Sequence, residues 1–335
     1  MSRRLLAPGW RSALLALIGF LVLPDFPSVL RSIVPVTETW ILLAGALAIC
    51  AALGWWNGGG GWLAIAAILL GWYAAMAPVG AGPGEYRSLV HGWTLLLGAS
   101  FGLASLLTPG QRFLIRGLGA VGIATFIAFA VAVSTPDGVS SVRSVMKSEF
   151  NRRTEATVSE VNEMAATPFW KSAAQRNPGL DSIVAANVTE LRTIGDRAPN
   201  TVPALVALES LLALALAWVI YHRLASAELG PTLGSVKEFR FNDQLVWGLA
   251  VGATIFFLPV FADGRNAGLN LLVFFGALYL LRGVGVLSFM TRSKWAATLL
   301  IAMTVLAPLM LGALALGIGV GDTWMDWRTR AKANK

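Results

Sequence analysis

The chain has 335 residues, of which 56% are hydrophobic and only 13% are charged, and its formal net charge is +8. Soluble domains carry about one quarter charged residues, so this composition excludes an ordinary soluble domain and indicates a protein whose solvent is a lipid bilayer. The positive charge does not indicate nucleic-acid binding. Its excess lies in short stretches between apolar runs, as topology-setting charge does, and no basic patch with interleaved aromatic residues occurs.

Nine apolar stretches are long enough to be membrane-spanning helices, since a span takes about 20 apolar residues. They lie at roughly 12–34, 39–56, 61–79, 89–107, 113–134, 203–222, 245–262, 267–290 and 295–320. Continuous apolarity over these lengths excludes short buried strands, and the runs do not alternate as the strands of a membrane barrel do. We therefore expect an all-α, polytopic transmembrane helical bundle of about eight or nine spans.

The first and last stretches are the two whose crossing the sequence leaves open. Pro24 and Pro27 flank Asp25, so an uninterrupted helix is not expected there. Asp25 is a candidate substrate-binding residue, because broken helices at membrane depth occur where they line a cavity. The alternative is an aspartate in a loop at the outer face. In the last stretch, Pro308 predicts a kink.

The basic residues favour a cytoplasmic N-terminus, because the short outer loops then hold only Arg87 and Arg265. Nine spans place the basic C-terminal tail outside. If the first stretch does not cross, the tail lies in the cytoplasm but the basic inner loops move outside. If the last stretch is re-entrant, the basic tail and the basic inner loops both lie in the cytoplasm. The charges are consistent with each of these topologies.

A polar segment, 135–201, separates the fifth and sixth spans and carries eight basic and eight acidic residues. Its apolar residues recur at helical spacing, and Pro168 and Pro178 interrupt the pattern, which predicts two amphipathic helices. These helices either lie on the membrane surface or cap the bundle, or they form a solvated hairpin that packs on itself. The expected domains are therefore N-terminal transmembrane helices (1–134), an amphipathic helical insertion (135–201) and C-terminal transmembrane helices with a short basic tail (202–335).

Small residues recur at four-residue spacing in several apolar stretches. They are Gly98 and Gly102, Gly248 and Gly252, and Ala44, Ala48 and Ala52. Close helix packing accounts for all three groups.

The stretch from about Val202 to Lys332 carries a family resemblance, over roughly the last 40% of the chain. Its motifs are Tyr221-His222-Arg223-Leu224, Leu258-Pro259, Asn270-Leu271, Tyr279-Leu280-Leu281-Arg282-Gly283, Gly317-Ile318-Gly319-Val320-Gly321-Asp322 and Asp326-Trp327-Arg328. They resemble the YybS-like family of bacterial membrane proteins, a domain of unknown function. That family is similar, distantly, to the substrate-binding S components of energy-coupling-factor vitamin transporters. The resemblance implies a multi-pass protein of the bacterial inner membrane with a substrate-binding or transport-related role.

Polar residues inside the apolar stretches are the other candidate substrate-binding residues. Glu209 lies about two turns into its stretch, where a carboxylate serves as a proton or cation site or a substrate contact, or is a paired structural group near the interface. Arg282 either extends to lipid phosphates, or pairs with Glu209, or holds an anionic substrate. Asn270 is expected to bond to a neighbouring helix or to a ligand.

Three charged residues follow the last span: Asp322, Asp326 and Arg328. The resemblance draws attention to them, and an Asp–Arg pair at the membrane edge would fix the tail or dock a partner. Their chemistry alone is equally consistent with a solvated interface.

No pattern in the sequence indicates an enzyme. It has two histidines, no His-Glu-x-x-His pair, no Gly-x-Ser-x-Gly turn and no phosphate-binding loop. The single cysteine, Cys50, lies in an apolar run and is expected to be a small buried hydrophobe.

We expect no catalytic activity, no metal and no cofactor. The expected partners are the lipid bilayer, a small-molecule substrate and a membrane-protein partner. The alternative function is a non-transporting scaffold or cell-envelope factor that acts through protein partners.

Overall fold

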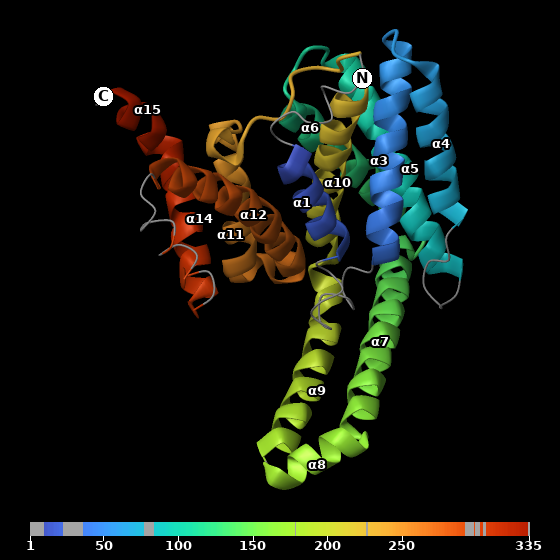
Figure 1. Ribbon diagram of the computed structural model, residues 1–335, viewed down its shortest axis with the longest axis vertical. Coiled ribbons are helices and arrows are strands. Elements are labelled where there is room, and N and C mark those ends of the chain that lie inside the picture. The colour runs from blue at the N-terminus through green and yellow to red at the C-terminus, as the bar shows by residue number, and fades with distance from the viewer. Residues whose placement is uncertain are drawn as a thin grey trace. The chain divides into compact units, whose positions relative to one another are not determined.

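The computed structural model describes residues 10–22, 36–76, 84–177, 179–225, 227–291, 298, 302–303 and 306–333. All regular secondary structure within these ranges is helical (Figure 1), which confirms the predicted all-α class. The α-helices are α1 Trp10–Val22, α3 Val36–Trp56, α4 Gly61–Met76, α5 Gly84–Leu107, α6 Phe113–Ser134, α7 Gly138–Ala165, α8 Pro168–Arg176, α9 Gly179–Arg197, α10 Val202–Leu224, α11 Val246–Phe257, α12 Arg265–Met290, α14 Pro308–Met325 and α15 Trp327–Ala333.

Among the described residues, six helical segments are long and apolar enough to cross a membrane. They are Glu38–Trp56, Gly84–Leu107, Phe113–Ser134, Val202–Leu224, Pro259–Met290 and Pro308–Met325, and three shorter apolar segments are Ala13–Val22, Gly61–Met76 and Asp243–Phe257. Each of the nine predicted stretches overlaps one of these segments. The helical path is interrupted at the predicted place, because Ala307 has a non-helical conformation (φ −145°, ψ 59°). Pro308 is the first residue of α14, where its missing N–H costs no hydrogen bond.

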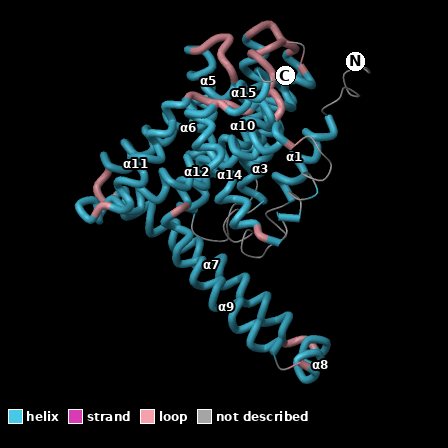
Figure 2. Tube along the Cα trace, turned by 90° about the vertical axis from the view of Figure 1, so that its left-hand side faces the viewer, coloured by secondary structure: helices cyan, strands magenta, loops and turns pink. Residues whose placement is uncertain are grey.

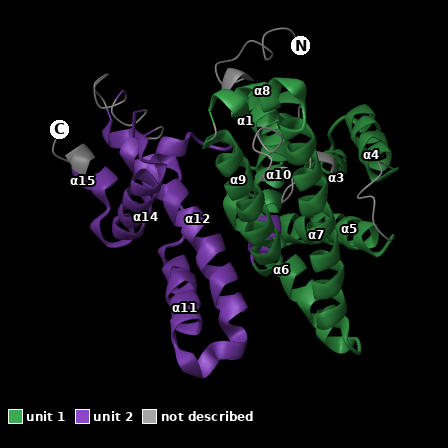
Figure 3. Ribbon diagram, turned by 90° about the horizontal axis from the view of Figure 1, so that it is seen from below, with its two compact units in different colours: residues 1–200, 209–232 green, residues 201–208, 233–335 purple. Residues whose placement is uncertain are grey.

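The chain forms two compact units, coloured separately in Figure 3. Unit 1 comprises residues 1–200 and 209–232, and unit 2 comprises residues 201–208 and 233–335. The division cuts α10, whose first residues belong to unit 2 and whose remainder belongs to unit 1.

In unit 1, α3 is the most buried of the described N-terminal helices and packs against α4 and α5. Ala44 and Cys50 are fully buried, as expected for small apolar residues. A Cβ built on Gly71 of α4 would lie 3.2 Å from the Cβ of Ala48, so the small residues of α3 do allow close helix packing. Gly98 differs, because a Cβ there would meet nothing within 4 Å.

The polar segment forms a hairpin in which α7 and α9 pack along each other and α8 lies at the far end (Figures 1 and 2). The alternative in which the helices pack on one another is therefore the one observed, with a third short helix that the periodicity did not predict. Pro168 occupies the start of α8, and Thr167 caps that helix by accepting a hydrogen bond from the backbone N–H of Trp170. Pro178 lies outside the described residues.

In unit 2, α12 packs against α11 and α14. The crossing of α12 and α14 depends on two glycines. A Cβ built on Gly283 would lie 1.7 Å from the carbonyl oxygen of Ala315, and one on Gly319 would lie 1.8 Å from that of Tyr279. Helix backbones this close leave no room for any side chain at these positions.

We therefore expect Gly283→Ala to destabilise unit 2 by about 1–3 kcal/mol, because the added methyl group must separate α12 from α14. Gly276→Ala is the matched control on the same helix. A Cβ there meets nothing within 4 Å, so the higher helix propensity of alanine should leave stability unchanged or raise it by up to about 1 kcal/mol. Thermal unfolding in detergent micelles measures both, and equal shifts would contradict the close crossing.

Candidate functional site

Glu209 of α10 lies half-buried in unit 1, against α3. Its Oε1 atom accepts a hydrogen bond of 2.7 Å from the hydroxyl of Thr39, which is fully buried. The next residue, Ser210, is also fully buried and accepts a hydrogen bond of 2.9 Å from the indole N–H of Trp93 on α5. Side-chain hydrogen bonds thus join three apolar helices at the level of Glu209.

A chain of charged groups continues from Glu209 to the base of the hairpin. Arg153 of α7 donates from Nη2 to Glu38, the neighbour of Thr39 on α3, and from Nε to Glu149 at 2.8 Å. Arg152 donates to both carboxylate oxygens of Glu149, at 2.9 and 2.6 Å. Glu38 and Arg153 also lie close enough to Glu209 to act on its charge. We call Glu38, Thr39, Glu149, Arg152, Arg153 and Glu209 the Glu209 cluster.

The Glu209 cluster carries one more carboxylate than it has guanidinium groups. Three glutamates face two arginines, so the cluster has a net charge of −1 when every group is ionised. The ring of Tyr86 lies 4.9 Å from the Arg153 guanidinium and screens it from solvent on one side. A surplus carboxylate in such surroundings favours a proton or another cation.

The hairpin side of the cluster stays charged. Burial acts to raise the pKa of Glu149, but hydrogen bonds from Arg152 and Arg153 outweigh it and hold that pKa below its ordinary value. Burial likewise acts to lower the pKa of Arg153, but the charge of Glu38, followed by those of Tyr86 and Glu149, raises it above its ordinary value. One nitrogen of this guanidinium, Nη1, is buried without a hydrogen-bond partner.

Arg282 lies in unit 2 and is only 2% exposed, so the interpretation that it extends to lipid phosphates is wrong. Its Nε atom donates to Asp322 Oδ2 at 3.0 Å, and its Nη2 atom donates to the carbonyl oxygen of the same residue at 3.1 Å. Its Nη1 atom donates to Asp243 at 2.6 Å. The anionic partners of Arg282 are therefore Asp322 and Asp243, in place of the Glu209 or anionic substrate that the sequence suggested.

Asp322 also accepts a hydrogen bond of 2.8 Å from Arg328, whose Nη1 atom donates to the carbonyl oxygens of Lys237 and Phe239. Asp322 and Arg328 are buried, so the solvated interface is excluded for both. We call Asp243, Arg282, Asp322 and Arg328 the unit 2 charge cluster. It fixes α15, the start of the tail, to α12, α14 and the segment before α11.

Asp326 lies at the surface of the same region. It ends α14 with a left-handed backbone conformation (φ 40°) and forms a half-exposed ion pair with Arg240. This pair joins α14 to the segment that Arg328 holds. The tail contacts that the sequence suggested are thus present within unit 2, whereas docking of a partner stays a prediction.

Asn270 bonds to a neighbouring helix, which was one of its two expected roles. Its side-chain oxygen accepts a hydrogen bond of 2.8 Å from the backbone N–H of Ala204, in the first turn of α10. First-turn N–H groups have no partner within their own helix, so this contact satisfies one of them. Asn270 and Arg282 lie twelve residues apart on α12, about 18 Å along the axis, and do not share a site. Asp25 lies outside the described residues.

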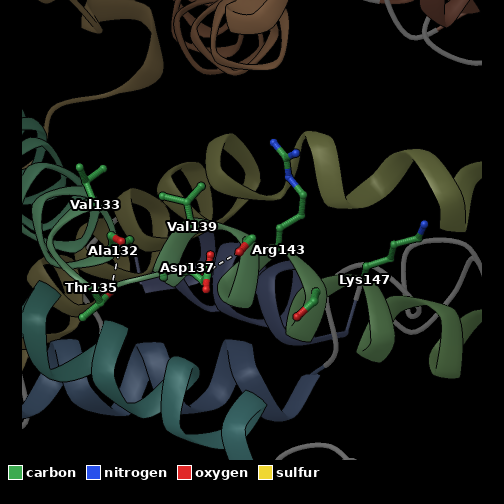
Figure 4. Close-up of a pocket in the computed structure, with 10 residues that line it drawn as sticks. Ala132, Val133, Thr135, Asp137, Val139, Arg143 and Lys147 are labelled. Carbon is green, nitrogen blue, oxygen red and sulfur yellow. Dashed lines mark hydrogen bonds between the residues drawn. The ribbon is translucent and has the colours of Figure 1, made fainter.

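An open cleft of about 610 Å³ lies where α6 ends and α7 begins (Figure 4). Val133 and Val139 form part of its apolar wall, and Asp137, Arg143 and Lys147 supply its charges. None of the residues singled out from the sequence lines this cleft.

Sequence reasoning missed Thr39, Glu38, Glu149 and Arg153 as neighbours of Glu209. Two signals were available. Thr39 and Glu38 are polar residues at the start of an apolar stretch, and Glu149 precedes Arg152 and Arg153 at the three- and four-residue spacing that places side chains on one helix face. Neither signal says which helices become neighbours.

No curated protein and no solved structure matches the chain. A family model described as a predicted membrane protein (DUF2232) matches residues 94–323, from α5 into α14. The match begins far upstream of the stretch whose motifs carried the resemblance, so it includes the hairpin and Arg153 as well as Glu209, Arg282 and Asp322. It covers more than half of the chain, and the chain therefore belongs to the DUF2232 family of predicted membrane proteins.

Proposed function

We propose that this protein is a substrate-binding or transport component of the bacterial inner membrane, and that the Glu209 cluster contacts its substrate or a coupled ion. The observation that carries the proposal is the Glu209 carboxylate, half-buried in an apolar span and hydrogen-bonded by a threonine hydroxyl. A carboxylate at this depth is costly and is retained where it binds a proton, a cation or a polar ligand. The resemblance to the YybS-like family and the S components supports the same class.

The charges of the cluster favour a cationic or protonatable ligand. Arg153 is already paired with Glu38 and Glu149, which leaves Glu209 as the carboxylate without a guanidinium partner in the cluster. A proton or an amino group that approaches Glu209 would neutralise the surplus negative charge. The Thr39 hydroxyl can serve both states, because it donates to the ionised carboxylate and accepts from the protonated one.

Equilibrium binding of a panel of vitamins and their precursors to the purified protein, combined with uptake in cells, tests this proposal. We expect one ligand to bind and Glu209→Gln to weaken binding or uptake by at least about tenfold, the loss expected for one charge-assisted contact. Glu190→Gln, an exposed position on α9, is the charge-matched control and should leave both unchanged. If no ligand binds and uptake is the same in all three proteins, the proposal is wrong.

One observation favours the alternative of a scaffold or cell-envelope factor that acts through protein partners. The far end of the hairpin exposes large apolar side chains in a polar segment: Phe169 is 80% exposed, and Met164 and Ile183 are also exposed. Phe169→Ser leaves the base of the hairpin and its ion pairs intact. A stoichiometric partner that co-purifies with the wild-type protein, and is lost with Phe169→Ser or on deletion of 140–198, would support the scaffold.

The proposal includes no catalytic step. A purified protein that hydrolyses lipids or cleaves proteins in an activity screen would contradict this part of it.

A further inference from the structure

Arg116 of α6 is a buried cation without a carboxylate partner among the described residues. It is 2% exposed, and its Nη1 atom donates to the carbonyl oxygen of Leu229 at 2.8 Å. Its Nε and Nη2 atoms have no hydrogen-bond partner. The other buried arginines in the described ranges are each paired with a carboxylate; they are Arg153, Arg282 and Arg328. Buried guanidinium donors that lack an acceptor are costly, so an acceptor is expected there.

The N-terminus of α6 adds further positive potential at this place. The helix begins at Phe113 without a side-chain cap, and its first turn contains no acidic residue. The first N–H groups of a helix lack their usual partners within it, and the helix dipole makes this end positive. In α6 the N–H of Ile115 donates to the carbonyl oxygen of Arg112. Acidic residues are usual at such an end, but here the preceding residue is the exposed Arg112.

The guanidinium of Arg116 lies beside this helix end. Side chains of a helix point towards its N-terminus. A Cβ built on Gly230 would lie 3.2 Å from Arg116 Nη2 and 3.3 Å from the carbonyl oxygen of Gln111, which places the guanidinium near the residues just before α6. The first-turn N–H groups, Arg112 and Arg116 therefore gather at one end of the helix.

A short loop covers the guanidinium. Trp218 lies under it, with the ring centre 5.3 Å from the guanidinium carbon, and the indole N–H donates to the carbonyl oxygen of Pro231. The backbone N–H of Leu229 donates to His222. Gly230, the next residue of this loop, has a φ of +159°, and a Cβ built on it would lie 3.2 Å from Arg116 Nη2. The covering loop supplies one acceptor, the Leu229 carbonyl oxygen, and leaves two donors unused.

We propose that Arg116, Arg112 and the N-terminus of α6 form a binding site for a phosphate-bearing anion. A phosphate group can accept hydrogen bonds from guanidinium Nε and Nη2 together and from the first backbone N–H groups of a helix. The site begins a membrane span, the level at which lipid headgroups lie, so the phosphate belongs either to a lipid or to a free ion. Trp218 lies nine residues beyond Glu209 on α10, about 13 Å, so this site is separate from the Glu209 cluster.

Two arms of one experiment on the purified full chain test the site and distinguish its source. Native mass spectrometry compares nanodiscs of phosphatidylglycerol with nanodiscs of phosphatidylcholine. Thermal unfolding in detergent compares inorganic phosphate with chloride at equal ionic strength. We expect the wild-type protein to retain the anionic lipid or to be stabilised by phosphate, and Arg116→Gln to weaken that binding by at least about tenfold. Arg87→Gln makes the same charge change at the far end of α5 and should bind like the wild type.

Lipid retention without a response to phosphate identifies a headgroup, and a response in detergent identifies a free anion; each supports the site. Equal binding by wild type, Arg116→Gln and Arg87→Gln overturns it, and so does the absence of any binding by the wild type in both arms. Should Arg116→Gln not fold, Arg112→Gln replaces an exposed side chain at the same helix end. A loss of about threefold or more in that variant supports the site, and unchanged binding overturns it.

Discussion

Replacing Asp322 by asparagine is expected to lower the free energy of unfolding of unit 2 by about 3–5 kcal/mol. The Oδ2 atom of Asp322 accepts hydrogen bonds from both Arg282 and Arg328, and all three side chains are buried. Without the carboxylate, two buried guanidinium groups face each other. The carboxylate of Asp243 is 59% exposed and pairs with Arg282 but not with Arg328. Thermal or denaturant-induced unfolding of the purified protein in micelles measures the loss.

Asp326→Asn provides the matched control, since it makes the same change four residues further along. Its partner is Arg240, and the two side chains are 43% and 39% exposed. Exposed ion pairs contribute about 0–1 kcal/mol, so this variant should remain close to the wild type. Equal losses in the two variants would mean that burial does not determine the strength of these pairs, and the assignment of the unit 2 charge cluster would be wrong.

The helices of this protein could be predicted because a span carries its own signal. A run of about 20 apolar residues forms a helix in a membrane wherever its neighbours lie, since only a helix satisfies its backbone hydrogen bonds within the segment. The helical periodicity of 135–201 identified α7 and α9 in the same way. The short α8 was missed because its nine residues give too little periodicity to distinguish a helix from a loop.

The partners of the charged residues could not be predicted, because they depend on which helices pack together. Glu209 bonds to Thr39 across 170 residues of sequence, and Arg282 bonds to Asp322 and Asp243 across 40 and 39. A local sequence pattern carries no information about partners that lie so far apart in the sequence. The alternatives considered for Arg282 from the sequence therefore did not include the two aspartates that bind it.

The hairpin shows the same limit in its charged residues. Arg153 and Arg192 both lie on amphipathic helices with glutamates nearby, yet Arg153 is buried in the Glu209 cluster and Arg192 forms an exposed pair with Glu155. The count of eight basic and eight acidic residues does not tell which of these two arginines is buried and which is exposed. The difference arises only where the base of α7 packs against the apolar helices of unit 1.

Arg153→Met is expected to weaken the attachment of the hairpin base to α3 by about 3–5 kcal/mol, because Glu38 and Glu149 lose their shared buried cation. Hydrogen exchange of the α7 backbone N–H groups measures this attachment directly. Arg192→Met is the control on the other helix of the hairpin, where both partners are more than half exposed and the expected loss is about 0–1 kcal/mol. Equal protection of α7 in the two variants would show that Arg153 does not hold the hairpin.

Acid is expected to weaken the attachment of the hairpin base to α3, because it protonates Glu149. Burial acts to raise the pKa of this carboxyl, but Arg152 and Arg153 hold it below the ordinary value that it recovers on unfolding. The unfolded chain therefore binds this proton at higher pH than the folded chain. The contribution of Glu149 to stability is complete above the ordinary glutamate pKa and is lost as the pH falls through the lowered folded value. We expect α7 to exchange faster only in that acid range, after correction for intrinsic exchange rates, and Glu149→Gln to remove this pH dependence. The same acid dependence in both proteins would assign the effect to another carboxyl group.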